Sequence, residues 1–192
     1  MNLPTYLTLG RICLAPLVVV FVISTEWIHS LVAAIIFAAA ALTDWLDGHL
    51  ARRRRQVTTL GTLLDPVADK LLVAAALISL VQVDRVEAWI AVLIIGRELA
   101  VTGLRGVSAG QGVVIAASDL AKYKTAFQYL AITLLILEKN VPVALEAEYV
   151  YISRGMLWAA LTLTVVSGID YFVRFYRGRD IDALVREDDR WR

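Results

Sequence analysis

The stretch TDWLDGHLARRRRQVTTLGTLLDPVADK, residues 43–70, places four aspartates and a run of arginines between two apolar segments. The aspartates are Asp44, Asp47, Asp65 and Asp69. Charged groups are costly next to a lipid environment, and carboxylates gathered there usually serve a function. This stretch therefore bears both on how the apolar segments are arranged and on where the chemistry lies.

The composition is that of a membrane protein. Hydrophobic residues make up 59% of the 192 residues and charged residues 19%, and the mean hydropathy is +0.67. Such a balance lies outside the range of soluble domains and predicts an all-α integral membrane protein. The net charge of +1 argues against a nucleic-acid partner. A single cysteine, Cys13, excludes an intramolecular disulfide and a cysteine-rich metal site.

Six apolar runs are long enough, at about 20 residues each, to cross a hydrocarbon core of about 30 Å. We expect one six-helix transmembrane domain over residues 1–192, with a short juxtamembrane segment 1–6 and a charged, solvated or interfacial tail 174–192. The first run lacks a small-residue cleavage site and is interpreted as a retained helix. The predicted spans are 7–24, 28–46, 62–82, 88–104, 119–138 and 153–173.

The loop charges predict the orientation. Basic residues cluster at 51–55, around Arg105, at Lys122 and Lys124, and in the tail, whereas the acidic loops are 83–87 and 139–152. By the positive-inside rule the basic set is cytoplasmic. Six crossings then place both termini and the aspartate-rich stretch in the cytoplasm.

The spacing of the aspartates gathers them on helix faces. At about 100° per residue, Asp44, Asp47, Gly48 and Ala51 fall within an arc of roughly 100° on a continued second helix. Two carboxylates and two small residues therefore share one face.

The third helix repeats this arrangement, with Gly61, Asp65 and Asp69 within about 80° of each other. A short basic turn joins the two helices, so we expect antiparallel neighbours whose four carboxylates converge at the cytoplasmic end. A simpler alternative treats Asp65 as an N-cap before Pro66. The third helix would then begin at Pro66, or else begin near Thr58 and kink.

Converging carboxylates repel each other unless cations bind them. Oxygen-only ligands suit Mg²⁺, Mn²⁺ or Ca²⁺ rather than zinc, and four carboxylates can hold two ions. The small residues Gly48, Ala51 and Gly61 leave room for a ligand's phosphates. A divalent-cation transporter would also use intramembrane carboxylates, but no acidic path continues across the membrane from this cluster.

The pattern D-x2-D-G-x2-A-R-x8-G-x3-D-x3-D, read from Asp44, resembles the signature of the CDP-alcohol phosphatidyltransferases. The resemblance implies a six-helix membrane fold, a homodimer, two Mg²⁺ or Mn²⁺ ions, and displacement of CMP from a CDP-linked lipid by an alcohol. It implies metal ligation by Asp44, Asp47, Asp65 and Asp69, with Asp69 also as the general base. The implied CDP-binding residues are Asp47, Gly48, Ala51, Arg52 and Gly61.

The acceptor is expected to carry a phosphate, because basic groups lie in or beside the fourth and fifth runs. The expected phosphate ligands are Arg97, Arg105, Lys122 and Lys124, of which Arg97 is the most deeply placed. The alternatives are membrane anchoring for the lysines and an ion pair, with Glu98 or an aspartate, for Arg97.

The segments GRE, LR and KYKT, together with the N-terminal NLPTYLTLGRI, resemble the phosphatidylglycerophosphate synthases. That resemblance implies CDP-diacylglycerol as donor, sn-glycerol 3-phosphate as acceptor, and a bacterial inner membrane location. Ala121 departs from the glycine that the group often has there. Inositol phosphate, serine and phosphatidylglycerol therefore stay open as alternative acceptors.

Overall fold

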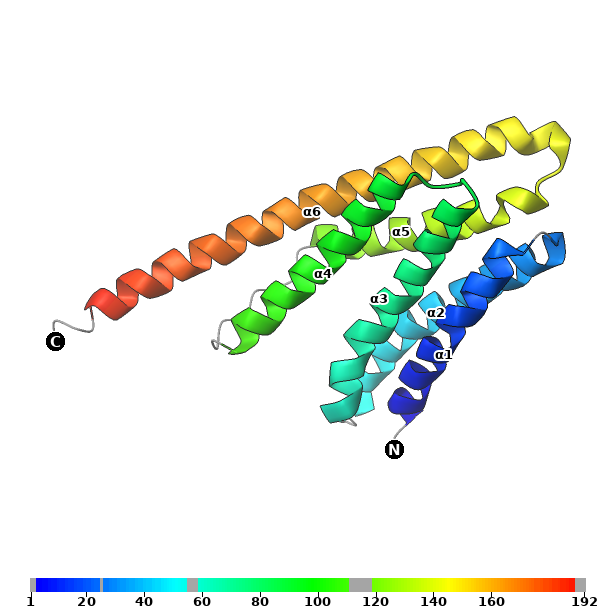
Figure 1. Cartoon of the computed structure of the whole chain (residues 1–192). Helices are drawn as coiled ribbons and strands as arrows, with labels where there is room; N and C mark the ends of the chain where they lie inside the picture. The colour runs from blue at the N-terminus through cyan, green and yellow to red at the C-terminus, as the bar shows by residue number, and fades with distance from the viewer. Residues whose placement is uncertain (1–2, 25, 55–58, 111–118, 189–192) are drawn as a thin grey trace.

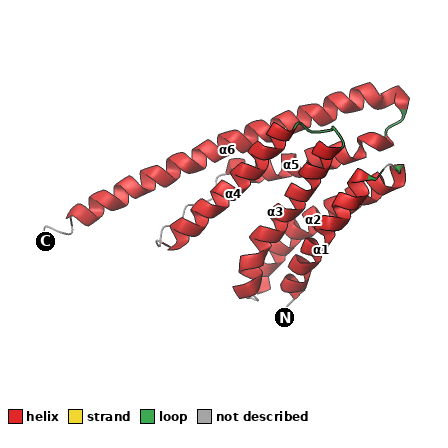
Figure 2. Ribbon diagram, viewed as in Figure 1, coloured by secondary structure: helices red, strands yellow, loops and turns green. Residues whose placement is uncertain are grey.

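The structure is a computed structural model that describes residues 3–24, 26–54, 59–110 and 119–188, with the backbone alone for 3–7, 44–54, 59–65, 119, 121 and 178–188. The described residues are almost entirely helical and contain no strand (Figure 2). Two short 3₁₀ turns, η1 (Glu138–Asn140) and η2 (Val143–Leu145), precede the last helix. The six long helices are α1 (Leu3–Ile23), α2 (Trp27–Arg54), α3 (Thr59–Gln82), α4 (Ala88–Gly110), α5 (Asp119–Leu137) and α6 (Glu146–Asp188).

Each predicted apolar run coincides with one of these helices, so the all-α prediction is confirmed. The boundaries differ most in α6, which begins before the predicted residue 153 and continues to Asp188 through most of the predicted tail. Hydropathy marks only the apolar part of a helix, whereas backbone hydrogen bonding continues through charged residues until a breaker intervenes. No proline interrupts α6, and an i,i+4 ion pair between Arg174 and Asp170 supports its charged part.

The start of α3 settles the alternative at Pro66. The helix begins at Thr59, and Pro66 lies inside it. Asp65 is therefore within the helix rather than at its N-cap. Gly61, Asp65 and Asp69 belong to one helix, as the spacing argument requires.

The helices α1, α2 and α3 form one side of the molecule, and α6 runs past α4 and α5 on the other (Figure 1). α1 packs against both α2 and α3, and α5 contacts α2, α3 and α6. The N-terminal end of α1, the C-terminal end of α2 and the N-terminal end of α3 lie together at one end of the molecule (Figure 1). The predicted antiparallel course of α2 and α3 is confirmed. The prediction that they pack as close neighbours is not, because among the described residues α3 packs mainly against α1 and α4, and α2 packs against α1 and α5.

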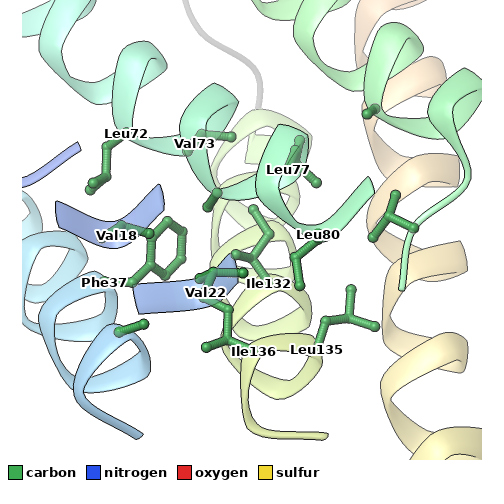
Figure 3. Close-up of a cluster of buried hydrophobic side chains, with 14 of the residues drawn as sticks. Val18, Val22, Phe37, Leu72, Val73, Leu77, Leu80, Ile132, Leu135 and Ile136 are labelled. Carbon is green, nitrogen blue, oxygen red and sulfur yellow. The ribbon is translucent and has the colours of Figure 1, made fainter. Parts of the chain in front are cut away.

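The core lies where α1, α2, α3 and α5 meet (Figure 3). Phe37 of α2 is completely buried, as are Val18 of α1 and Leu72 of α3. Buried alanines such as Ala33 and Ala76 let the helix backbones approach closely. Small residues at contacts favour association in lipid, where close packing rather than transfer from water holds helices together.

The turn between α3 and α4 has the hydrogen bonds of a Schellman motif. The Arg85 amide donates to the Leu80 carbonyl at 2.9 Å, and the Asp84 amide donates to Val81 at 3.1 Å. Asp84 adopts φ of 57°, in the left-handed region that aspartate tolerates better than most residues. This motif ends α3 and directs the chain into α4.

Among the described residues, Val143–Arg177 is a helical segment long and apolar enough to cross a bilayer. The parts Thr8–Ile23 of α1 and Trp27–Thr43 of α2 are apolar as well. The acidic loop expected on the far side of the membrane contains η1 and η2.

Candidate active site

Asp69 is the one aspartate of the signature whose side chain the structure describes. It lies on α3, one turn after Asp65, and is half-buried. The hydroxyl of Tyr129, on α5, donates a hydrogen bond to Asp69 Oδ1. The Tyr129 ring in turn packs against Phe37 of α2, with the ring centroids 5.4 Å apart. Three helices therefore fix the position of this carboxylate.

A small cavity of about 20 Å³ adjoins Asp69, a volume on the order of one water molecule. It brings the predicted base and the predicted phosphate ligand Lys124 into one site, although they are 55 positions apart in the chain (124 − 69). The cavity is lined by Asp69, Lys70, Val73, Glu98, Lys124, Thr125, Gln128 and Tyr129.

Glu98 connects this cavity to Arg97. Its Oε1 accepts hydrogen bonds from Arg97 at 3.0 Å and from the Lys124 ammonium. Arg97 also donates to the Ser167 hydroxyl of α6 at 2.9 Å. The ion pair that the sequence left open for Arg97 is thus present. One carboxylate faces two cations, so the trio keeps one net positive charge that favours an anionic ligand.

The other two predicted phosphate ligands, Arg105 and Lys122, are not among the residues that line the Asp69 cavity. The Arg105 guanidinium lies over the ring of Tyr171 on α6, 5.4 Å from its centroid. Lys122 is exposed. The structure therefore places Lys124 in the same cavity as Asp69 and connects Arg97 to that cavity through Glu98, whereas Arg105 faces α6.

The remaining predicted site residues lie on helical backbone whose side chains are outside the described residues. Asp44, Asp47, Gly48, Ala51 and Arg52 belong to α2, and Gly61 and Asp65 belong to the first turns of α3. The ends of the two helices that carry them lie together (Figure 1). The metal cluster itself stays a prediction.

The described part of the site fits a hard cation. Asp69 offers carboxylate oxygen, the donor type that Mg²⁺ and Mn²⁺ prefer. Tyr129 occupies one acceptor position of Oδ1, and an ionised carboxylate has about four such positions. A metal ion and the Tyr129 hydroxyl can therefore bind the same side chain.

Residues 1–166 match the family model described as CDP-alcohol phosphatidyltransferase. The chain belongs to this family. The match covers α1 to α5 and the first half of α6, which includes every residue singled out above except Ser167, Asp170, Tyr171 and Arg174. Membership favours the transferase interpretation of the aspartates over the transporter.

Individual members of the family are similar to the chain over most of its length. A CDP-diacylglycerol–glycerol-3-phosphate 3-phosphatidyltransferase of Bacillus subtilis is 45% identical, over 89% of this chain and 93% of its own. The enzyme of the same name from Rickettsia typhi is 37% identical, over 89% and 95%. A CMP-forming cardiolipin synthase of Oryza sativa is 34% identical, over 92% of this chain and 58% of its own.

In this phosphatidyltransferase, sequence reasoning missed six of the eight residues that line the cavity: Lys70 and Val73 on α3, Glu98 as a bridge between cations, and Thr125, Gln128 and Tyr129 on α5. A signal was available in their spacing. Gln128 follows Lys124 by four positions and Tyr129 follows Thr125 by four, so each pair stands on one face of α5 and the two faces adjoin. The tyrosine could have been chosen only by knowing that α5 packs beside α3.

Proposed function

We propose that the protein transfers a phosphatidyl group from CDP-diacylglycerol to sn-glycerol 3-phosphate, giving phosphatidylglycerophosphate and CMP. Family membership and the two bacterial relatives of that activity support the donor chemistry. The observation that carries the choice of acceptor is the cavity in which Lys124 lies beside Asp69. It pairs a base for the acceptor hydroxyl with a cation for the acceptor phosphate.

Asp69 takes the proton of the attacking hydroxyl, and Tyr129 keeps its carboxylate oriented toward the cavity. Lys124 and Arg97 bind the acceptor's phosphate, assisted by Arg105 and Lys122 nearer the cytoplasm. Arg52 and the small residues Gly48, Ala51 and Gly61, with Asp47, hold the CDP group.

Two Mg²⁺ or Mn²⁺ ions are proposed, with Asp44, Asp47, Asp65 and Asp69 as their ligands. When bound, they would neutralise the pyrophosphate and polarise the attacked phosphorus. The protein's own groups align the donor and acceptor and stabilise the charge that develops.

The enzyme is proposed to be a homodimer in a bacterial inner membrane. All six helices cross it, and the active site and both termini face the cytoplasm. The apolar helices of the structure and the basic loops at the aspartate end support this placement.

Phosphatidylglycerol is the second candidate acceptor, because a cardiolipin synthase is also among the relatives. It carries a phosphate that Lys124 could bind, as does inositol phosphate. Serine has a carboxylate but no phosphate, so a phosphate-binding role of Lys124 and Arg97 favours it least.

Incubation of the purified protein with CDP-diacylglycerol, Mg²⁺ and each acceptor in turn tests the proposal. We expect CMP release and a new lipid with glycerol 3-phosphate, and little with serine. Chelation of the metal should stop CMP release reversibly, and Asp44→Asn, Asp47→Asn and Asp65→Asn should abolish turnover in folded protein. If product formed only with phosphatidylglycerol, the reaction would be assigned as cardiolipin synthesis. Full activity after chelation would refute the proposed metal site.

A further inference from the structure

A groove of about 630 Å³ lies between α4 and α6, outside the site described above. The two helices run beside each other, in contact (Figure 1). Its walls are almost entirely apolar and include Val92, Gly96, Arg97, Gly168, Phe172 and Arg177. A volume of this size accommodates a small-molecule ligand.

The groove and the Asp69 cavity lie on different faces of α4. Glu98 lines the Asp69 cavity, whereas Gly96 and Ala100 line the groove. Among the described residues that line the groove, Arg97 is connected to the cavity: it donates a hydrogen bond to Glu98, and another to Ser167 of α6. Occupation of the groove is therefore an event distinct from phosphatidyl transfer.

Glycines on both walls shape the groove. A Cβ atom at Gly168 would lie 3.1 Å from Arg97 Cγ, so the absent side chain lets Arg97 lie against α6. A Cβ atom at Gly96 would meet nothing within 4 Å. The space in front of Gly96 is open, and a larger side chain there would fill the groove without displacing the fold.

The groove has the length of one leaflet. Its α6 wall runs from Val165 to Arg177, which at 1.5 Å per residue is about 18 Å. Half of a hydrocarbon core of about 30 Å is about 15 Å. Charged residues recur in the sequence from Arg174 onward, so Arg177 lies where the apolar part of α6 gives way to a charged part, and the exposed Tyr176 beside it is typical of a membrane interface.

The charges that line the groove are both positive. They are Arg97 and Arg177, and no acidic residue lines it among the described residues. Arg174, one turn earlier, is already paired with Asp170 at 3.0 Å. In the part of the chain that the structure describes, no carboxylate pairs with Arg177. A cation at the interfacial end of an apolar groove is complementary to an anionic phospholipid.

We propose that this groove binds one acyl chain of an anionic phospholipid of the surrounding membrane, with the lipid phosphate on Arg177. The chain lies along the α6 wall past Phe172 and Ile169, and the open space at Gly96 receives its middle carbons. A zwitterionic lipid of the same chain length binds more weakly, because its own cationic group offsets the attraction.

Thermal unfolding of the full chain tests this in nanodiscs of phosphatidylglycerol and of phosphatidylcholine with identical acyl chains. We expect wild type to unfold at a higher temperature in phosphatidylglycerol. Gly96→Leu should remove that difference, whereas Gly103→Leu, on the same helix with equally open space, should keep it. Arg177→Gln should weaken phosphatidylglycerol binding about fivefold, since a basic residue near an anionic surface contributes about that factor. Arg174→Gln should leave it unchanged.

A photoactivatable side chain at the exposed Ile169 identifies the occupant directly. Irradiation in mixed nanodiscs should give adducts with the mass of phosphatidylglycerol in excess over phosphatidylcholine. Equal adducts of the two lipids, or thermal shifts unaffected by Gly96→Leu, would overturn the proposal. So would a covalent dimer of the chain, which would make the groove an interface between two copies. None of these measurements requires turnover. A failure of the lipid-binding proposal can therefore be distinguished from a failure of the proposed transferase activity.

Discussion

At the scale of single residues, the hydroxyl of Tyr129 fixes the carboxylate of Asp69 across the contact between α5 and α3. We predict that Tyr129→Phe lowers kcat roughly ten- to a hundredfold with little change in the KM for CDP-diacylglycerol. The reason is that a hydrogen bond to a charged group is worth about 1.5–3 kcal/mol, and its loss lets the base turn away from the acceptor. Steady-state CMP release measures both constants.

Tyr149→Phe is the matched control for that prediction. The Tyr149 hydroxyl donates to the Leu134 carbonyl at 2.9 Å, between α6 and α5 and away from the Asp69 cavity. The same loss of one hydroxyl there should cost some stability and leave kcat unchanged. Equal kcat values for wild type and Tyr129→Phe would contradict the positioning role.

Lys124 is the residue that we expect to determine affinity for the acceptor. The sequence predicts Arg97 as the phosphate ligand placed most deeply in the apolar segments. In the structure, however, Lys124 is only 3% exposed and lines the same cavity as Asp69. Lys124→Gln should raise the KM for glycerol 3-phosphate about ten- to a hundredfold and change that for CDP-diacylglycerol little. Arg97→Gln should have a similar but smaller effect, and Arg105→Gln, which faces Tyr171, the smallest.

Paired measurements of the two Michaelis constants distinguish a phosphate contact from a structural ion pair. If Lys124→Gln weakened both substrates equally, Lys124 would serve only to neutralise Glu98. If none of the cation variants altered the KM for glycerol 3-phosphate or for CDP-diacylglycerol, glycerol 3-phosphate would lose its support as the acceptor. Inositol phosphate, serine and phosphatidylglycerol would then be open again as acceptors.

At the scale of elements, a partly buried network at the end opposite the aspartates joins the α3–α4 turn to α5 and α6. Arg85 donates to the carbonyls of Leu135 and Ile136 at 2.8 and 3.0 Å, which satisfies the C-terminal end of α5. Glu138 lies 3.8 Å from both Arg85 and Arg154. Burial lowers the pKa of the Arg85 guanidinium, and the Glu138 carboxylate opposes that shift.

Removal of Arg85 should therefore loosen the packing of these elements. We predict that Arg85→Met lowers the free energy of unfolding by about 2–3 kcal/mol, because two carbonyls and part of the Glu138 charge lose their partner. Arg174→Met breaks an exposed i,i+4 pair and should cost about 0–1 kcal/mol. Thermal unfolding in detergent compares the two, and an equal loss in both would show that the network adds nothing beyond a surface pair.

At the scale of the whole molecule, the charge distribution predicts the orientation of the chain in the membrane. In a Cys13→Ser background, Arg54→Cys and Ala147→Cys should react with an impermeant thiol reagent from opposite sides of a sealed membrane. Arg54 ends α2 beside the aspartates, and Ala147 lies in the first turn of α6. Labelling from one side only would mean that the number of crossings between them is even.

The sequence by itself determined the all-α class, the number of long helices and the family, since hydropathy and fixed spacing are local properties of the chain. It also predicted Asp69 as a site residue, because the helical spacing of the four aspartates gathers them on two helix faces. Helix ends were predicted less well: α6 continues to Asp188 because hydrogen bonding, unlike hydropathy, does not stop at charged residues.

Only the tertiary structure decided which side chains meet. Tyr129 contacts Asp69 over 60 positions, and Arg97 contacts Ser167 over 70. Nothing in the residue types or their local spacing specifies either partner, since both depend on which faces of α3, α4, α5 and α6 pack together. The groove between α4 and α6 has the same origin: Gly96 and Gly168 are unremarkable in the sequence and become a site only where two helices run side by side. Contacts between distant segments are set by packing of the whole chain, which no local pattern encodes.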